Sequence, residues 1–110
     1  MNTCSKVAIL FLISLMPLAL IALEKGDAAK GKEVFMRRCS VCHGESGEGK
    51  EAIGKMLGVK MPVLGSKKVQ SLDDAQIRKI VLEGKGKMKP VNLSDQELID
   101  VTAFLRTLKK

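Results

Sequence analysis

Two cysteines and the only histidine of the chain lie together in the run Cys39-Ser40-Val41-Cys42-His43. The spacing is C-x-x-C-H, which is typical of covalent haem attachment. On a helical turn the three side chains share one face, because residues three and four positions apart are neighbours. Two thioether bonds from Cys39 and Cys42 would fix a porphyrin, and the imidazole of His43 would be an axial ligand of its iron. The run therefore predicts one haem c per chain.

Other chemistry also uses the C-x-x-C spacing. A tetrahedral zinc site requires four ligands, and the only further cysteine is Cys4, in the N-terminal apolar segment. A thioredoxin-like dithiol should follow a strand, whereas residues 27–38 before Cys39 are predicted to be a helix. A structural disulfide between Cys39 and Cys42 would need no cofactor. A dithiol is therefore the main alternative to haem attachment.

The N-terminal segment has the pattern of an export signal. Lys6 precedes an uncharged apolar run from Val7 to Leu23. As a helix this run would span about 26 Å, which is less than the roughly 30 Å of hydrocarbon in a bilayer. Pro17 near its middle fits a cleaved segment better than a straight membrane span. We therefore predict a signal peptide at residues 1–22, with a retained membrane anchor as the alternative.

Export agrees with the haem motif. Haem c is attached on the outer side of the energy-coupling membrane, where oxidising conditions tolerate paired thiols. We therefore expect the mature protein in the periplasm. Cleavage would remove Cys4 and leave one domain, residues 23–110. A domain of this size is small for a core of its own, and a covalently held porphyrin would supply an apolar centre.

The charge of the chain limits its partners. The net charge is +7 at pH 7, and +6 without Lys6, while Trp and Tyr are absent. Nucleic-acid binding is a poor interpretation, because single strands are held by aromatic stacking as well as by charge. An acidic protein partner or an anionic membrane surface suits the lysines better. The alternative is that the lysines only keep a small protein soluble.

One helix is predicted before a loop-rich section of the chain, and a second helix is predicted after it. The first begins after Asp27, a favourable N-cap, and runs to the haem motif. The second begins at Ser71, with Asp74 as its capping-box partner. It ends at Gly84, a residue type that commonly terminates helices.

A third helix is predicted at the C-terminus. It begins at Ser94 with Glu97 as capping-box partner. Its apolar stripe at helical spacing consists of Leu98, Val101, Leu105 and Leu108. No strand alternation is convincing, and we expect loops over residues 44–54, 58–68 and 84–92.

The sixth position of the iron needs a ligand other than His43. The usual ligand in electron-carrying haem proteins without a second His is a Met thioether. The candidates after the export segment are Met36, Met56, Met61 and Met88. Met36 is too close to Cys39 to reach the opposite face, and Met56 lies in an apolar stretch where packing is expected. Met61 is a candidate, but Met88 is favoured, because it lies among lysines in a flexible loop between two helices. Its alternative role is to fill a gap in the core.

The mature chain resembles small mono-haem class I cytochromes c of the bacterial kind. The resemblance rests on Gly31-x-x-x-Phe35, Cys39 to Gly44, Pro62-Val63-Leu64, Gly84 to Pro90, and Phe104-Leu105-Arg106. It implies an all-α, compact cytochrome c fold of three to five helices around one covalently bound haem. It also implies that Met88 lies on the distal side of the haem.

The resemblance implies two further contacts. The first and last helices should cross at Gly31, near Phe35 and Phe104. The carbonyl of Pro62 should accept a hydrogen bond from His43, which orients the ring.

The chain also departs from the family pattern. Lys89 separates Met88 from Pro90, where the family often has proline directly. There is no Trp or Tyr for the propionate contact that many members make, so the propionate partners stay unassigned. The position of Pro62 would place Met61 on the proximal side of the haem.

These observations together predict a monomeric, non-enzymatic electron carrier. Its cofactor-binding residues are Cys39, Cys42, His43 and Met88, of which His43 and Met88 bind iron, and its redox partners have acidic docking surfaces. One alternative is a haem enzyme or gas sensor with a labile sixth ligand, although the chain offers no distal His. Another is a membrane-anchored redox domain of a larger respiratory complex, if the apolar N-terminal run is retained.

Overall fold

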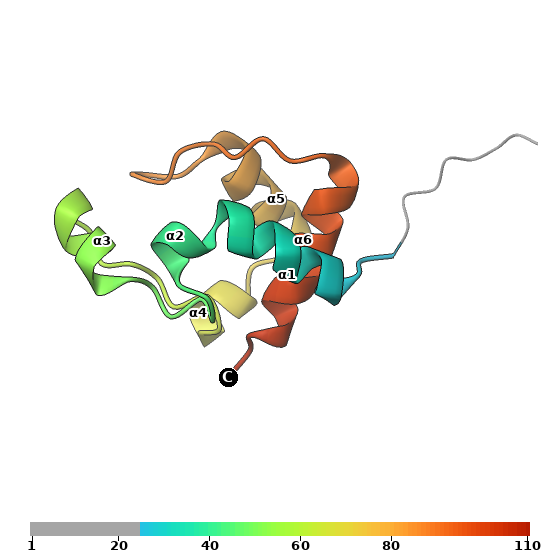
Figure 1. The fold of residues 1–110 in the computed structure, drawn as a ribbon, viewed down its shortest axis with the longest axis horizontal. Helices are drawn as coiled ribbons and strands as arrows, with labels where there is room; N and C mark the ends of the chain where they lie inside the picture. The colour runs from blue at the N-terminus through green and yellow to red at the C-terminus, as the bar shows by residue number, and fades with distance from the viewer. Residues whose placement is uncertain (1–24) are drawn as a thin grey trace, which may run out of the picture.

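The computed structural model describes residues 25–110, which form six α-helices and one isolated bridge (Figure 1). The helices are α1 (Ala28–Arg38), α2 (Ser40–His43), α3 (Glu51–Leu57), α4 (Lys67–Gln70), α5 (Asp74–Glu83) and α6 (Asp95–Thr107). The predicted all-α class is confirmed. The helix count exceeds the expected three to five because α2 and α4 are turns of 4 residues each.

The predicted signal peptide at residues 1–22 lies outside the described residues, and so does its boundary with the domain. Within residues 25–110, none of the helices has the length and apolar character needed to cross a bilayer.

The first and last long helices cross at Gly31, as the resemblance implied. A Cβ atom on Gly31 would overlap the backbone carbonyl of Asp100 in α6, so only glycine permits this approach. The rings of Phe35 and Phe104 meet beside the crossing, with centroids 5.1 Å apart and planes tilted by 53°. This tilted arrangement is a favourable aromatic geometry.

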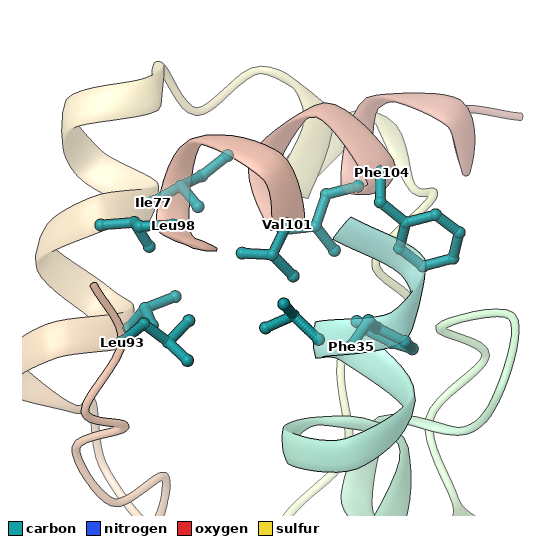
Figure 2. Close-up of a cluster of buried hydrophobic side chains, with 9 residues drawn as sticks. Phe35, Ile77, Leu93, Leu98, Val101 and Phe104 are labelled. Carbon is teal, nitrogen blue, oxygen red and sulfur yellow. The ribbon is translucent and has the colours of Figure 1, made fainter. Parts of the chain in front are cut away.

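The buried core follows this crossing and extends to α5. Figure 2 shows Phe35 of α1, Val101 and Phe104 of α6, and Ile77 of α5 around one apolar centre. The full cluster comprises Val34, Phe35, Ile77, Val81, Leu93, Leu98, Val101, Phe104 and Leu105. Of the stripe predicted for the last helix, only Leu108 is partly exposed.

The N-caps of the long helices agree with prediction at two of three positions. Asp27 caps α1 by accepting hydrogen bonds from the amides of Ala29 and Lys30. Ser94 and Glu97 form the predicted capping box of α6.

The start of α5 was predicted two residues too early. Its N-cap is Asp73, which accepts from the amide of Gln76 over 2.7 Å, and the Gln76 side chain accepts from the amide of Asp73 over 2.9 Å. Ser71 instead follows the end of α4, where its hydroxyl donates to the carbonyl oxygen of Lys68. Its Oγ is therefore engaged with the preceding turn, and Asp73 makes the capping box.

Two short helices, α3 and α4, overlap in part the loops predicted at residues 44–54 and 58–68. α3 has no side-chain cap at Lys50, and α4 is a single turn capped by the hydroxyl of Ser66. Neither has an apolar stripe long enough to predict a helix from periodicity.

Candidate functional site

The C-x-x-C-H run forms α2, which continues directly from α1. The amide of Cys39 donates to the carbonyl oxygen of Phe35 over 2.8 Å, so the turn is tied to the core residue that packs on α6. The amides of Cys42 and His43 both donate to the carbonyl oxygen of Cys39, over 3.2 and 3.0 Å. The predicted helical turn is therefore present, and Cys39, Cys42 and His43 are all half-buried.

The two cysteines are free thiols in this turn. Burial raises the pKa of Cys39 to about 11, with Arg38 lowering it and Cys42 raising it to smaller extents. A redox-active dithiol requires a lowered thiol pKa, which gives a reactive thiolate at neutral pH. The thioredoxin-like alternative therefore fits this site poorly, and the two thiols are not joined as a structural disulfide here.

His43 has the properties of a neutral metal ligand. Burial lowers its pKa, so the imidazole is uncharged at neutral pH, which is the form that binds a metal ion. Its Nδ1 atom is buried and has no hydrogen-bond partner among the described residues. No three side chains of the His, Cys, Asp and Glu types gather within residues 25–110 to hold a bare metal ion. The donor set fits a haem attached at two thiols and ligated by one imidazole.

The hydrogen bond expected between His43 and the carbonyl of Pro62 is not formed in this structure. The Pro62 carbonyl oxygen instead faces Gly49, at 3.1 Å from where a Cβ atom would stand. Gly49 in turn donates its amide to the carbonyl oxygen of His43 over 2.7 Å. The loop of Pro62 thus lies against the backbone segment that follows His43, but its carbonyl does not reach the ring.

The segment after His43 is held in a compact turn by Glu48. The Glu48 carboxylate accepts from the amide and the hydroxyl of Ser46, over 3.0 and 2.9 Å. It also lies against Gly44, where a Cβ atom would overlap it. Hydrogen bonds from the backbone of Glu48 itself, and then from the hydroxyl and amide of Ser46, lower the pKa of this carboxyl.

Met88 lies in a hydrogen-bonded turn, not in the flexible loop that was expected. Lys85 and Met88 form an antiparallel bridge, with amide-to-carbonyl distances of 3.0 and 2.9 Å. Beyond it, the amide of Val91 donates to the carbonyl oxygen of Val81 at the end of α5. Met88 is half-buried, whereas the flanking Lys87 and Lys89 are exposed. In Figure 1 the segment between α5 and α6 extends toward the side of the molecule that carries α2 and α3.

The other methionines occupy distinct environments. Met36 packs against the core cluster from α1. Met61 is half-buried beside Gly49 and Gly54, and so lies next to the segment that follows His43. The packing role expected for Met56 is wrong, because this side chain is 73% exposed on α3.

Sequence analysis missed two polar residues near this site. Gln70 and Arg106 make hydrogen bonds to backbone carbonyls more than 30 positions away in the chain. Gln70 belongs to no motif, and Arg106 was named only within the closing Phe104-Leu105-Arg106 run, so these hydrogen bonds could be revealed only by the tertiary structure.

The family model for cytochrome c matches residues 28–109. The chain belongs to the cytochrome c family. It is 32% identical over 90 residues to cytochrome c-554(547) of Halothiobacillus neapolitanus, which covers 76% of this chain and 99% of that protein. It is also 32% identical over 85 residues to FixP, a cbb3-type cytochrome c oxidase subunit of Azorhizobium caulinodans, which covers 74% of this chain but only 27% of FixP.

Solved structures show the same cytochrome c fold. The c-type cytochrome KustC0563 matches with a TM-score of 0.61 and 25% identity, over 73% of this chain and 98% of that one. Cytochrome cL of Hyphomicrobium denitrificans matches with a TM-score of 0.56 and 26% identity, over 76% of this chain and 48% of that one. The resemblance stated from the motifs is thereby confirmed. Membership of the family implies covalently bound haem c and electron transfer with redox partners.

The carboxyl of Glu48 gives a test of the turn beside His43. Its folded pKa lies below its ordinary value of 4.5, so the ionised form stabilises the turn at neutral pH, and this contribution is lost as the pH falls through the folded pKa. We expect the amide resonance of Ser46 to titrate with a midpoint below 4.5 in an NMR pH series. In Ser46→Ala the midpoint should move upward, because one hydrogen bond to the carboxylate is gone. An unchanged midpoint in that variant would show that the hydroxyl contact does not form in solution.

Proposed function

We propose that this protein is a small exported electron carrier with one haem c attached through Cys39 and Cys42 and ligated axially by His43 and Met88. The observation that carries the proposal is the half-buried C-x-x-C-H turn at the end of α1, with free thiols and a neutral imidazole whose Nδ1 atom is buried. When bound, the haem supplies a one-electron couple. The remaining work of the chain is to hold, shield and present it.

The chain contributes two chemically different axial ligands in this proposal. His43 is held by the rigid turn that continues α1, and its neutral ring has a free Nε2 lone pair in the tautomer with a proton on Nδ1. The soft thioether of Met88 would stabilise the reduced iron and so raise the reduction potential. The support for Met88 is its half-burial at the end of a tight, hydrogen-bonded turn among exposed lysines. With both His43 and Met88 on the iron, no open position for a substrate would remain, which favours a carrier over a haem enzyme or gas sensor.

The proposed location is the periplasm and the proposed state is a monomer. The support for the location is the uncharged run from Val7 to Leu23 after Lys6, which fits a cleaved export signal.

The FixP relative favours a second candidate, a redox domain that serves a larger respiratory complex. FixP is named as an oxidase subunit, and the match covers 27% of its length. Retention of the run from Val7 to Leu23 as an anchor would distinguish this candidate from a free carrier.

The attachment of haem is tested by denaturation followed by acid–organic extraction. The colour should stay with the polypeptide, because thioether bonds survive the solvent. Intact mass should show one haem on a chain that begins near residue 23. The double variant Cys39→Ala, Cys42→Ala is the control and should release any haem it binds. Extraction of haem from the unaltered protein, leaving a bare polypeptide mass, would refute covalent attachment, and a full-length mass would favour the anchored candidate.

The axial ligands are tested by replacing one methionine at a time. Met88→Ala should remove the weak sulfur-to-iron absorption band of the ferric protein and let cyanide or carbon monoxide bind readily. The potential should fall by tenths of a volt, within the roughly 0.8 V range that axial ligands control. Met61→Leu is the matched control, because Met61 packs beside Gly49 and Gly54, and it should keep the band. If Met61→Leu loses the band and Met88→Ala keeps it, Met61 and not Met88 is the ligand, and our assignment is wrong.

Docking to an acidic partner is tested by charge reversal around the Met88 turn. Lys85, Lys87 and Lys89 are exposed there, and a basic patch steers an oppositely charged partner. Lys85→Glu with Lys87→Glu should lower the bimolecular electron-transfer rate with the native partner at low salt by about tenfold or more. The rate of the unaltered protein should fall as salt shortens the Debye length to about 10 Å at 0.1 M.

The control for this experiment carries the same change of charge elsewhere. Lys30→Glu with Lys32→Glu alters two exposed lysines in the N-terminal half of α1, away from the Met88 turn (Figure 1). If both double variants slow the reaction equally, the effect is one of net charge alone. A rate that is flat with salt and unaffected by either pair would leave the lysines of the turn a solvating role only.

A further inference from the structure

The loop that carries Pro62 to Gly65 is held between two parts of the molecule. On one side, the amide of Leu64 donates to the carbonyl oxygen of Gly47 over 2.8 Å, which ties the loop to the turn after His43. On the other side, the amide of Lys110 donates to the carbonyl oxygen of Gly65 over 3.1 Å. The loop thus connects the C-terminus of the chain with the segment that follows the proposed iron ligand.

The side chain of Gln70 occupies the centre of this connection. Its Nε2 group donates to the carbonyl oxygen of Leu64 over 2.9 Å and to the carbonyl oxygen of Leu105 over 2.8 Å. Both protons of the amide are therefore used, one on the loop and one on the last turn of α6. Leu64 is thus bonded on both sides: its carbonyl oxygen accepts from Gln70, and its amide donates to the carbonyl oxygen of Gly47.

The backbone of Gln70 is itself fixed by Arg106 of α6. The Arg106 guanidinium donates to the carbonyl oxygen of Gln70 over 3.1 Å, to that of Leu72 over 2.7 Å, and to the carboxylate of Asp74 over 2.7 Å. Three bonds from one planar group restrain its orientation strongly. Because the backbone of Gln70 is held in this way, its side-chain amide has a fixed starting point from which to donate.

Apolar packing supports the same connection. The side chains of Leu64 and Leu108 pack on Gly47. Each lies 2.9 Å from the position that a Cβ atom on Gly47 would take. Gly47 has φ of 69°, which glycine adopts without cost. The turn after His43 therefore lies directly against the loop and the C-terminal end of α6.

We propose that Gln70 is a positioning residue for His43. It acts by clamping Leu64, and with it the turn from Gly44 to Gly49, onto the last turn of α6. The inference rests on the proposed role of His43 as an axial ligand. The clamp holds the backbone that follows His43, whose carbonyl accepts the Gly49 amide over 2.7 Å, and so limits the freedom of the ligand against its iron.

The experiment compares Gln70→Leu, Gln70→Glu and the matched control Gln76→Leu in the haem-loaded protein. Gln70→Leu removes both N–H donors, and Gln70→Glu keeps the shape but places a carboxylate oxygen against both carbonyl oxygens at neutral pH. Gln76→Leu removes an exposed capping contact of α5 without touching the loop. Hydrogen exchange should accelerate at least tenfold at the amides of Leu64 and Gly49 in both Gln70 variants. The paramagnetically shifted His43 ring resonances of the ferric protein should move in the same two variants and not in the control.

Two results would overturn the proposal. One is unchanged exchange at Leu64 and Gly49 with unchanged His43 resonances. The other is equal acceleration at the core amide of Val101, which would show general destabilisation instead of a local clamp. Should Gln70→Leu fail to fold, Gln70→Asn, which is too short to span both carbonyls, is judged by the same criteria. Exchange at Leu64 does not depend on Met88 or on electron transfer, so failure of this inference and failure of the proposed function are separable.

Discussion

The crossing of α1 and α6 at Gly31 is the contact on which the rest of the structure depends. The C-x-x-C-H turn α2 has no buried residue of its own and takes its position from α1, through the hydrogen bond between the Cys39 amide and the Phe35 carbonyl. Phe35 is in turn fixed against Phe104 of α6. The close approach that Gly31 permits therefore determines where two thiols and an imidazole are presented. A side chain at position 31 would separate the helices and displace the attachment turn together with them.

The middle and the last turn of α6 stabilise the site in different ways. Its middle provides apolar packing, which is strong but not directional, whereas its last turn provides directed hydrogen bonds from Arg106 and through Gln70. The helix pairs with substantial packing among residues 25–110 are α1 with α6, α1 with α2, and α5 with α6. The loops beside α3 and α4 are therefore placed by hydrogen bonds together with the packing of single side chains such as Leu64. This division suits a domain whose apolar centre is completed by a prosthetic group, because directed bonds keep the surrounding loops in register.

The parts of the structure predicted from sequence are those that depend on local signals. The capping box at Ser94, the N-cap at Asp27 and the C-x-x-C-H turn are each decided within a few residues. The start of α5 was misplaced because Ser71 and Asp73 both offer a cap with a suitable partner three residues on. The structure resolves this competition by using Ser71 at the end of α4. The turn that holds Met88 is also formed by local backbone hydrogen bonds, but no residue pattern predicted them.

The contacts that sequence could not supply are those between a side chain and a distant backbone carbonyl. Gln70 and Leu105 are 35 positions apart, and any residue type offers a carbonyl, so the partner leaves no trace in the sequence. The same reasoning explains the wrong expectation for His43 and Pro62: a family motif identifies the acceptor residue but not the final orientation of its carbonyl. In this chain the carbonyl faces Gly49, and restraint of the His43 segment comes instead from the Gly49 amide and from the loop behind it. The position of the segment that follows His43 thus depends on contacts from the C-terminal half of the chain as much as on the C-x-x-C-H motif itself.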